Sequence, residues 1–279
     1  MKYKNMLILY KRKIYIIINI NRYITVIIIF IFHLPLNTQI IRKESPKRSI
    51  CNNSDTFFII ENMTKIVIHT YPARLWYVNN FLVPSLIDQG LTDIIIFNDK
   101  YHIGNLMAFI LSLKNIGDAW HLQDDVIISK DFAKRIKKYK NISCGFCAEG
   151  FQNEIVEGTT NIKNMWYSFP CLFIPGNIAE EFYSWFKDQE KNTDFIQMIN
   201  TGKMDDLIFK EYLQQKHPDM LIDNIVPNLV DHIDFLIGGS ICNKARKKIA
   251  RAKYFPDPEL VKNLESRVLE FKIQNNLPL

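Results

Sequence analysis

Two adjacent aspartates, Asp124 and Asp125, follow Gln123 and a short, mainly apolar run, Ala119 to Leu122, that has the length and composition of a buried strand. Carboxylates at the end of a buried strand are costly unless something neutralises them. A divalent cation is a common neutraliser, because hard cations take oxygen ligands. The simpler alternative is a turn in which one aspartate caps the following helix. Both interpretations are open from this stretch alone.

Short β-branched runs alternate with helical patterns through the central part of the chain. We expect strands at 65–70, 92–97, 119–122, 142–148 and 171–174, and helices at 75–89, 104–113, 132–139, 178–186 and 205–215. This alternation favours a single α/β domain with a mainly parallel sheet flanked by helices. Ligands bind beyond the carboxyl ends of such strands. We therefore expect Thr70, Asp99 and Asp125, which follow three strands, to share one edge.

The first 62 residues differ from the rest, being crowded with Ile, Asn, Lys and Tyr. Their clean apolar run, Ile24 to Phe32, is shorter than the roughly 20 residues that a membrane-spanning helix needs. Three interpretations stay open: a poor membrane anchor, a disordered extension, or translation upstream of the true start. We favour the last, because Met63-Thr64-Lys65 leads directly into a strand. The expected organisation is an extension at 1–62, a domain at 63–255 and a C-terminal tail at 256–279.

The net charge and the cysteine content indicate which partners and which cellular compartment to expect. The net charge of +6 indicates an anionic partner but is modest for a dedicated nucleic-acid binder. Five scattered cysteines do not form the pattern of a disulfide framework, which favours a reducing compartment. We expect a cytoplasmic protein, with weak membrane association left open. A basic run from Lys244 to Lys253 would suit a diphosphate or an anionic surface, although a solvated helix face is the commoner explanation.

Four short motifs follow one another in a recognisable order. They are His69 to Arg74 after the first strand, Leu122 to Val126, Met204 to Asp206 at a helix start, and Pro227 to His232 followed by Gly238-Gly239-Ser240. This order resembles bacterial and phage glycosyltransferases of the GT-A fold, which is related to the Rossmann fold. The likeness covers about residues 63–255. The metal motif of that family is usually Asp-x-Asp, and here Gln123 stands in place of its first acid.

The resemblance implies a hexosyltransferase-type enzyme that moves a sugar from a nucleotide-diphosphate donor to a glycan or another hydroxyl acceptor. It implies Mn²⁺ or Mg²⁺ as the cofactor, held by Asp125 and by His232, for which a phosphate contact or a structural role is the alternative. A divalent cation would stabilise the leaving nucleotide. The residues that would bind the donor are Thr70, Tyr71, Arg74, Asp99 and Asp124.

The second acidic pair, Asp205 and Asp206, lies where inverting members of the fold place a catalytic base. Such a carboxylate removes the proton of the acceptor hydroxyl as it attacks the anomeric carbon. The competing role is a helix N-cap, which suits two acids just before Leu207. One residue could cap while the other works, and we favour Asp206 as the base.

Three rival functions fit the sequence less well. A sugar nucleotidyltransferase would need a glycine-rich phosphate loop after the first strand, and Tyr71-Pro72-Ala73-Arg74 has no glycine. A nucleic-acid-binding protein would suit the positive charge, but paired acids repel phosphate, so no specific nucleic acid is expected as a partner. A membrane-tethered scaffold would leave the acidic strand ends unexplained. The sequence leaves open the donor sugar, the acceptor and the stereochemical outcome.

Overall fold

The computed structural model describes residues 64–99, 105–147, 157–161, 170–189, 192, 205–238, 252 and 254–278, and the backbone alone of the strands before residue 42. Two compact units are present, Met1–Asn37 and Thr38–Leu279. Among its described residues, the first unit holds a three-stranded antiparallel sheet in the order β1 (Met6–Tyr10), β2 (Lys13–Ile20) and β3 (Tyr23–Ile29).

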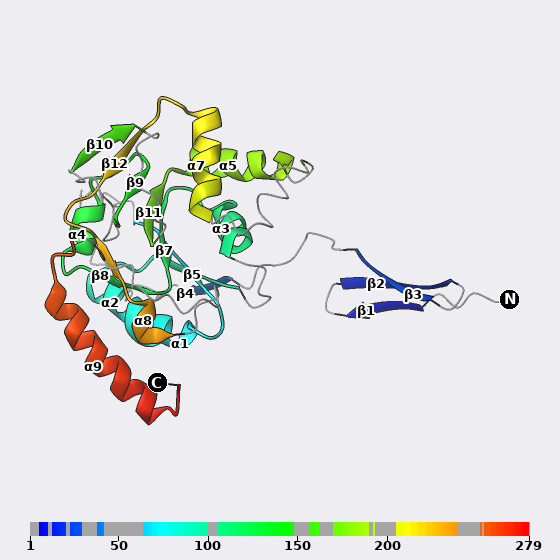
Figure 1. Cartoon of the computed structure of the whole chain (residues 1–279), viewed down its shortest axis with the longest axis horizontal. Coiled ribbons are helices and arrows are strands. Elements are labelled where there is room, and N and C mark those ends of the chain that lie inside the picture. Colours follow the sequence, from blue (N-terminus) through cyan, green and yellow to red (C-terminus); the bar gives the residue numbers. More distant parts are fainter. Residues whose placement is uncertain are drawn as a thin grey trace, which may run out of the picture. The chain divides into compact units, whose positions relative to one another are not determined.

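The second unit is built around an eight-stranded sheet (Figure 1). Its strands, in sheet order, are β10 (Gly158–Asn161), β12 (Leu221–Asn224), β9 (Ser143–Cys144), β11 (Cys171–Ile174), β7 (Ala119–Gln123), β5 (Ile66–Thr70), β6 (Ile94–Asn98) and β4 (Thr38–Ile41). β5 pairs in parallel with β6 and β7, and β9 with β12, whereas the other neighbours are antiparallel. The expected α/β class is confirmed, and the sheet is a mixed one.

The parallel strands β5, β6 and β7 bring their carboxyl ends to one edge. Thr70 lies level with Asn98, and His69 lies level with Gln123. The backbone N–H of Asp99 donates to the carbonyl of Thr70 at 2.7 Å. The three strand ends chosen from the sequence therefore share an edge, as expected from parallel pairing.

Two helical layers cover the sheet (Figure 1). One contains α1 (Leu75–Tyr77), the π-helical turn η1 (Val78–Leu82), α2 (Val83–Asp88), α4 (Phe132–Ile136), α8 (Asp234–Ile237) and α9 (Pro258–Gln274). The other contains α3 (Asn105–Leu113), α5 (Gly176–Gln189) and α7 (Asp205–Lys216). The single helix expected over 75–89 is divided by η1, just before Pro84, which cannot donate a backbone hydrogen bond.

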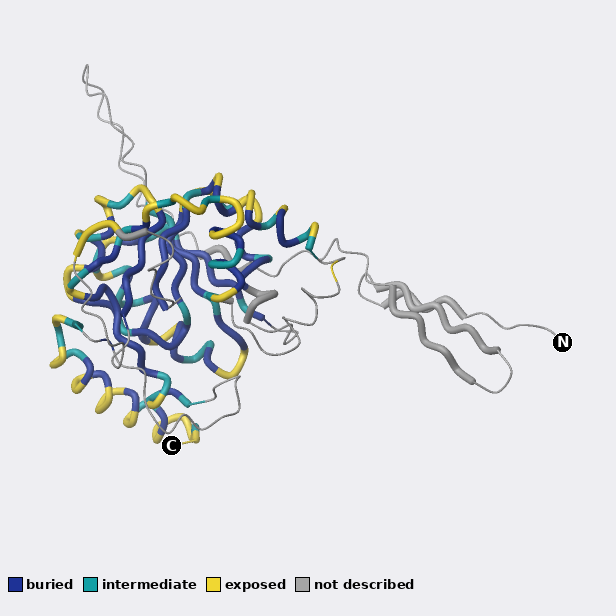
Figure 2. Tube along the Cα trace, turned by 45° about the horizontal axis from the view of Figure 1, so that its top comes forward, coloured by how far each residue is buried: buried dark blue, intermediate teal, exposed yellow. Residues whose placement is uncertain are grey.

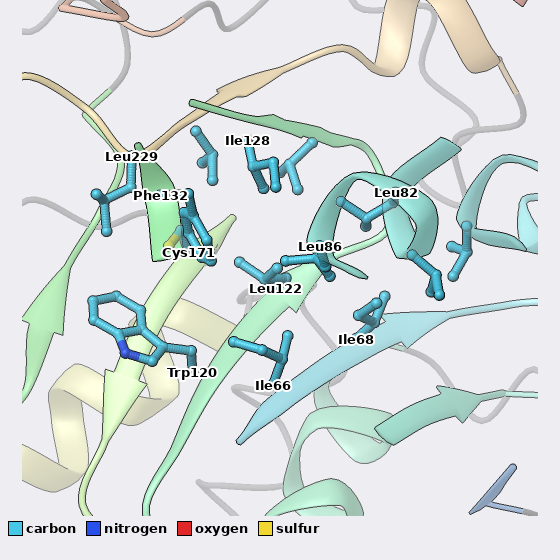
Figure 3. Close-up of a cluster of buried hydrophobic side chains, with 14 of the residues drawn as sticks. Ile66, Ile68, Leu82, Leu86, Trp120, Leu122, Ile128, Phe132, Cys171 and Leu229 are labelled. Carbon is cyan, nitrogen blue, oxygen red and sulfur yellow. The ribbon is translucent and has the colours of Figure 1, made fainter. Parts of the chain in front are cut away.

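Side-chain alternation along the strands supplies both layers with a core. Ile66 and Ile68 of β5, with Leu122 of β7, face the first layer and are fully buried there against Leu82 and neighbouring side chains (Figure 3). Residues 67 and 69 point to the opposite face, because successive strand residues alternate. The strands were predicted from short runs of β-branched residues. These runs are buried, and they lie in the centre of the second unit (Figure 2).

The segment expected as a tail contains a helix of the core. In α9, Val261, Leu264 and Val268 are buried in the same cluster as Ile66, and Phe271 stacks on Trp76 with ring centroids 5.5 Å apart. Buried and exposed residues succeed one another with the helical repeat along α9 (Figure 2). Leu264 and its buried neighbours thus make residues 258–274 part of the second unit.

The N-terminal boundary also differs from the expected one. β4, which lies within the expected extension, pairs antiparallel with β6, from Thr38 opposite Phe97 to Ile41 opposite Ile94. The second unit therefore begins before residue 63. Among the helices of the described residues, none has the length and apolar character needed to cross a membrane.

Candidate functional site

Asp124 and Asp125 form the turn between β7 and a short strand, β8 (Val126–Ile128). β8 pairs antiparallel with β13 (Val230–His232), and His232 lies opposite Val126. The backbone N–H of Ile233 also donates to the carbonyl of Asp125 at 2.8 Å. This second small sheet was not foreseen from the sequence. It places His232, a residue from a late segment, beside the acid pair.

Arg74 lies between the two carboxylates. Its Nη1 atom is 2.9 Å from Oδ1 of Asp124 and 2.5 Å from Oδ2 of Asp125, and its Nε donates to the carbonyl of Gly238 at 2.9 Å. Arg74 is only 5% exposed, and both aspartates are also buried. Burial opposes the charge of Arg74, but Asp125 and Asp124 outweigh it and raise its pKa above the ordinary value. One cation therefore serves two buried carboxylates.

His232 contacts the same oxygen of Asp125 that Arg74 contacts. Its Nε2 lies 3.0 Å from Oδ2 of Asp125, and its Nδ1 lies 3.8 Å from Oδ1 of Asp234, the first residue of α8. The rings of Phe146 and His232 make a T-shaped contact, with centroids 6.1 Å apart. Sequence reasoning missed Asp234. The sequence signal for it is the spacing Asp231-His232-Ile233-Asp234, in which an acid also follows the histidine two residues later.

The two aspartates differ in how readily they ionise. Burial and the neighbouring Asp125 raise the pKa of Asp124 to about 6, although Arg74 opposes them. Burial also resists ionisation of Asp125, but His232 and Arg74 outweigh it and hold the pKa of Asp125 below its ordinary value. Asp125 is therefore the firmly ionised member of the pair at neutral pH. This difference follows from the extra partner, His232, on Asp125 alone.

The remaining predicted donor residues surround this pair at the sheet edge. Thr70 ends β5 and is 5% exposed, and its hydroxyl lies close enough to Asp124 to favour the ionised carboxylate. The guanidinium of Arg74 lies over the ring of Tyr71, 5.6 Å from its centroid. Asp99 is buried just beyond β6. The structure thus gathers the acid pair, Arg74, Thr70, Tyr71 and His232, with Asp99 on the adjacent strand end.

Asp205 and Asp206 lie in the first turn of α7, which packs against α3 and α5 in the other helical layer. The N–H of Leu207 donates to Oδ1 of Asp206 at 2.8 Å. The side chain of Asp205 lies outside the described residues. The role of either residue as a base stays a prediction. The basic run 244–253 also lies outside the described residues, apart from Ala252, whose N–H donates to Oδ1 of Asp231.

Two carboxylate oxygens of the acid pair could serve as donor atoms for a cation. Oδ2 of Asp124 and Oδ1 of Asp125 are buried and have no hydrogen-bond partner among the described residues. Oxygen is the ligand that Mg²⁺ prefers, and Mg²⁺ often rests on one or two protein carboxylates, with substrate phosphates and water completing its shell. Within the described part of the chain, no group of three His, Cys, Asp or Glu side chains is arranged to hold a metal ion. The two carboxylates could supply part of the ligand shell of such an ion, with substrate and water supplying the rest.

His232 was predicted as a metal ligand, and in the structure its Nε2 lies 3.0 Å from Oδ2 of Asp125. Outer partners of this kind orient ligating carboxylates in metal sites. In this arrangement His232 suits the positioning of Asp125, and its direct ligation of a metal ion stays a prediction.

Comparison with known proteins adds no family to this picture. No protein-family model matches the chain, and no curated protein matches it either. A function must therefore be inferred from the residues of the site.

Proposed function

We propose that the second unit is a glycosyltransferase of the GT-A type, which transfers a sugar from a nucleotide-diphosphate donor to a hydroxyl acceptor with the help of Mn²⁺ or Mg²⁺. The observation that carries the proposal is the buried pair Asp124 and Asp125 at the carboxyl edge of parallel strands. Each carboxylate keeps one oxygen without a described partner while Arg74 holds the other. Such an edge is where α/β sheets bind nucleotides and phosphates.

The carboxylates of Asp124 and Asp125 would hold the cation. When bound, a divalent cation supplies positive charge that stabilises the leaving diphosphate. Asp125 suits the stronger ligand role, because its contact with His232 favours the ionised carboxylate. The remaining coordination positions would fall to diphosphate oxygens and water, which agrees with a site of two protein carboxylates.

The strand ends beside the acid pair would hold the rest of the donor. Asp99, at the end of β6, can accept hydrogen bonds from ribose hydroxyls or from N–H groups of the base. Tyr71 offers a ring and a hydroxyl at the end of β5, and Arg74 offers a planar guanidinium suited to phosphate. These residues are buried or nearly so, which would exclude water from the charged part of the donor.

The resemblance to GT-A glycosyltransferases assigns the activation of the acceptor hydroxyl to Asp206. Its carboxylate would remove the proton from the acceptor hydroxyl as that oxygen attacks the anomeric carbon. The new bond joins the acceptor oxygen to the sugar, and the bond to the diphosphate breaks with its electron pair staying on the diphosphate. The proposal names the donor as a nucleotide-diphosphate sugar and the acceptor as a hydroxyl compound, and it specifies neither further.

The proposal is tested on the full chain with a panel of nucleoside diphosphates and nucleotide sugars. Thermal unfolding is followed with each compound in Mn²⁺ and again in a chelator. We expect at least one compound to stabilise the protein in Mn²⁺ only, by about 2.7 kcal/mol at a hundredfold excess over its Kd. Equal stabilisation with metal and with chelator, or none with any compound, would contradict the proposal.

A matched pair of variants locates the binding. Asp125→Asn should abolish the metal-dependent stabilisation, because it replaces the ionised ligand by an amide. Asp219→Asn makes the same chemical change at an exposed acid between α7 and β12 and should leave it unchanged. If both variants respond to nucleotide and metal like the parent protein, the acid pair is not the site.

A further inference from the structure

A single nitrogen of Arg74 occupies the position between the two carboxylates. Nη1 contacts one oxygen of Asp124 and one oxygen of Asp125 at once, at 2.9 and 2.5 Å. The side chains of all three residues are at most 10% exposed, so water screens these charges little. A monovalent cation supplied by the chain itself thus lies where a cation bridging the pair would lie.

The geometry points to a regulatory role for this ion pair, which rests on the function proposed above. We propose that Arg74 is an internal counter-ion that keeps a divalent cation out of the acid pair until a diphosphate draws its guanidinium away. Arg74 would move from the carboxylates to the phosphates, and the cation would take its place between Asp124 and Asp125. Metal and nucleotide would then bind together and neither would bind well alone.

Two features of Arg74 suit such an exchange. Guanidinium groups form paired hydrogen bonds with phosphate as readily as with carboxylate, so the diphosphate offers an equivalent partner. The Nε atom is held by the carbonyl of Gly238 and not by either carboxylate. The outer nitrogens can therefore change partners while the contact with Gly238 keeps the side chain at the site.

Charge balance makes the exchange cooperative. With Arg74 in place, the two carboxylates carry at most one uncompensated negative charge, and a divalent cation would also meet the positive guanidinium. With Arg74 on the diphosphate, both carboxylates are available to the cation. Each ligand therefore raises the affinity of the other by the same factor, as linkage requires.

The test measures Mn²⁺ alone, without nucleotide, by electron paramagnetic resonance of the free ion. The variant Arg74→Gln removes the counter-ion and should bind Mn²⁺ about tenfold or more tightly than the parent protein, a factor within the usual range of coupling between sites. Arg74→Lys keeps a positive charge and should bind Mn²⁺ as weakly as the parent. Arg267→Gln removes an exposed arginine from α9 and should also bind as weakly.

Folding offers a second readout, because Arg74→Gln leaves two buried carboxylates without their cation. If this variant unfolds in buffer, millimolar Mn²⁺ should restore its folded circular dichroism, whereas the parent protein should gain little from Mn²⁺ alone. A variant that stays unfolded in Mn²⁺, or one that folds and binds Mn²⁺ no more tightly than the parent, would overturn the exchange.

The exchange and the proposed function fail in different ways. If the parent protein binds a nucleoside diphosphate in a metal-dependent manner but Arg74→Gln gains no affinity for Mn²⁺, the exchange is wrong and the function stands. If the parent protein binds no nucleoside diphosphate with or without Mn²⁺, the proposed function is wrong. Tighter Mn²⁺ binding by Arg74→Gln, with normal binding by the Arg267→Gln control, supports the exchange.

Discussion

The imidazole of His232 contacts Asp125, with its Nε2 atom 3.0 Å from Oδ2 of that carboxylate. Pairing of β13 with β8 creates this contact, because it sets His232 opposite Val126, the residue after Asp125. The carboxylate is thereby fixed by a histidine and an arginine on one oxygen, and its second oxygen is left for another partner.

Replacement of His232 tests whether this contact positions the carboxylate. We expect His232→Asn to weaken metal-dependent nucleotide binding about tenfold or more, as loss of outer partners does in metal sites. His232→Gln places an amide N–H near the position of Nε2 and should recover part of the loss. Calorimetric titration of a nucleoside diphosphate in Mn²⁺ measures both. Binding by His232→Asn at the parental affinity would show that the contact has no such role.

His121, which is buried, and His69, which is half-buried, predict a loss of stability in acid. The two imidazoles share a hydrogen bond at 3.1 Å on the α3 side of the sheet, next to Phe109. Burial lowers the pKa of His69 from 6.5 to about 3 and lowers the pKa of His121 well below 6.5. The unfolded chain therefore binds more protons than the native protein below pH 6.5, so this contribution to stability is complete above that pH and is lost as the pH falls.

The variant His121→Phe keeps a ring of similar size and removes one of these groups. Each buried imidazole contributes a slope of about 1.4 kcal/mol per pH unit to the stability of the protein in this range. Asp124, with its raised pKa of about 6, acts in the opposite sense between pH 3.8 and 6 in both proteins. Urea unfolding between pH 4 and 6.5 should therefore show a slope smaller by about 1.4 kcal/mol per pH unit in the variant. Identical slopes would mean that His121 is not held neutral.

Two leucines of α9 test whether this helix belongs to the core. Leu264 is 5% exposed and packs in the cluster with Ile66, whereas Leu269 is 49% exposed. We expect Leu264→Ala to lower the free energy of unfolding by about 2–5 kcal/mol, the cost of a cavity in a packed core. Leu269→Ala should change it by about 0.5 kcal/mol or less. Equal effects in urea unfolding would indicate that α9 is a loosely attached tail.

The size of the effect of replacing Asp206, on turnover and on stability, distinguishes a catalytic role from a helix-capping role. Loss of a general base costs about 10²–10⁴ in rate, whereas loss of a cap costs about 1 kcal/mol of stability. We expect Asp206→Asn to keep its fold and its nucleotide binding and to lose about two or more decades of turnover. Asp205→Asn is the neighbouring control and should retain most of its turnover. Normal turnover by a less stable Asp206→Asn would assign the residue to stabilising the start of α7, where its Oδ1 accepts from the N–H of Leu207.

The features that could be predicted from the sequence are those set by residues close together in the chain. The strands ending at Thr70 and Gln123 were predicted from β-branched or apolar runs followed by polar residues, and parallel pairing then placed their ends together. Strand β8 was missed, because three residues between a turn and a helix carry too little pattern. Helix α9 lies in the segment 256–279, for which only a tail was predicted, although its apolar residues recur at helical spacing.

Local pattern was enough to place the acid pair at the end of a buried strand and to suggest a cation nearby. Tertiary structure alone decided that Arg74 lies between Asp124 and Asp125, and that His232 fixes only the second of them. The physical reason is that a run of apolar residues specifies that a face is buried but not the surface against which it is buried. Contacts between segments far apart in the chain, such as β8 with β13, settle which charges meet and therefore which carboxylate stays ionised.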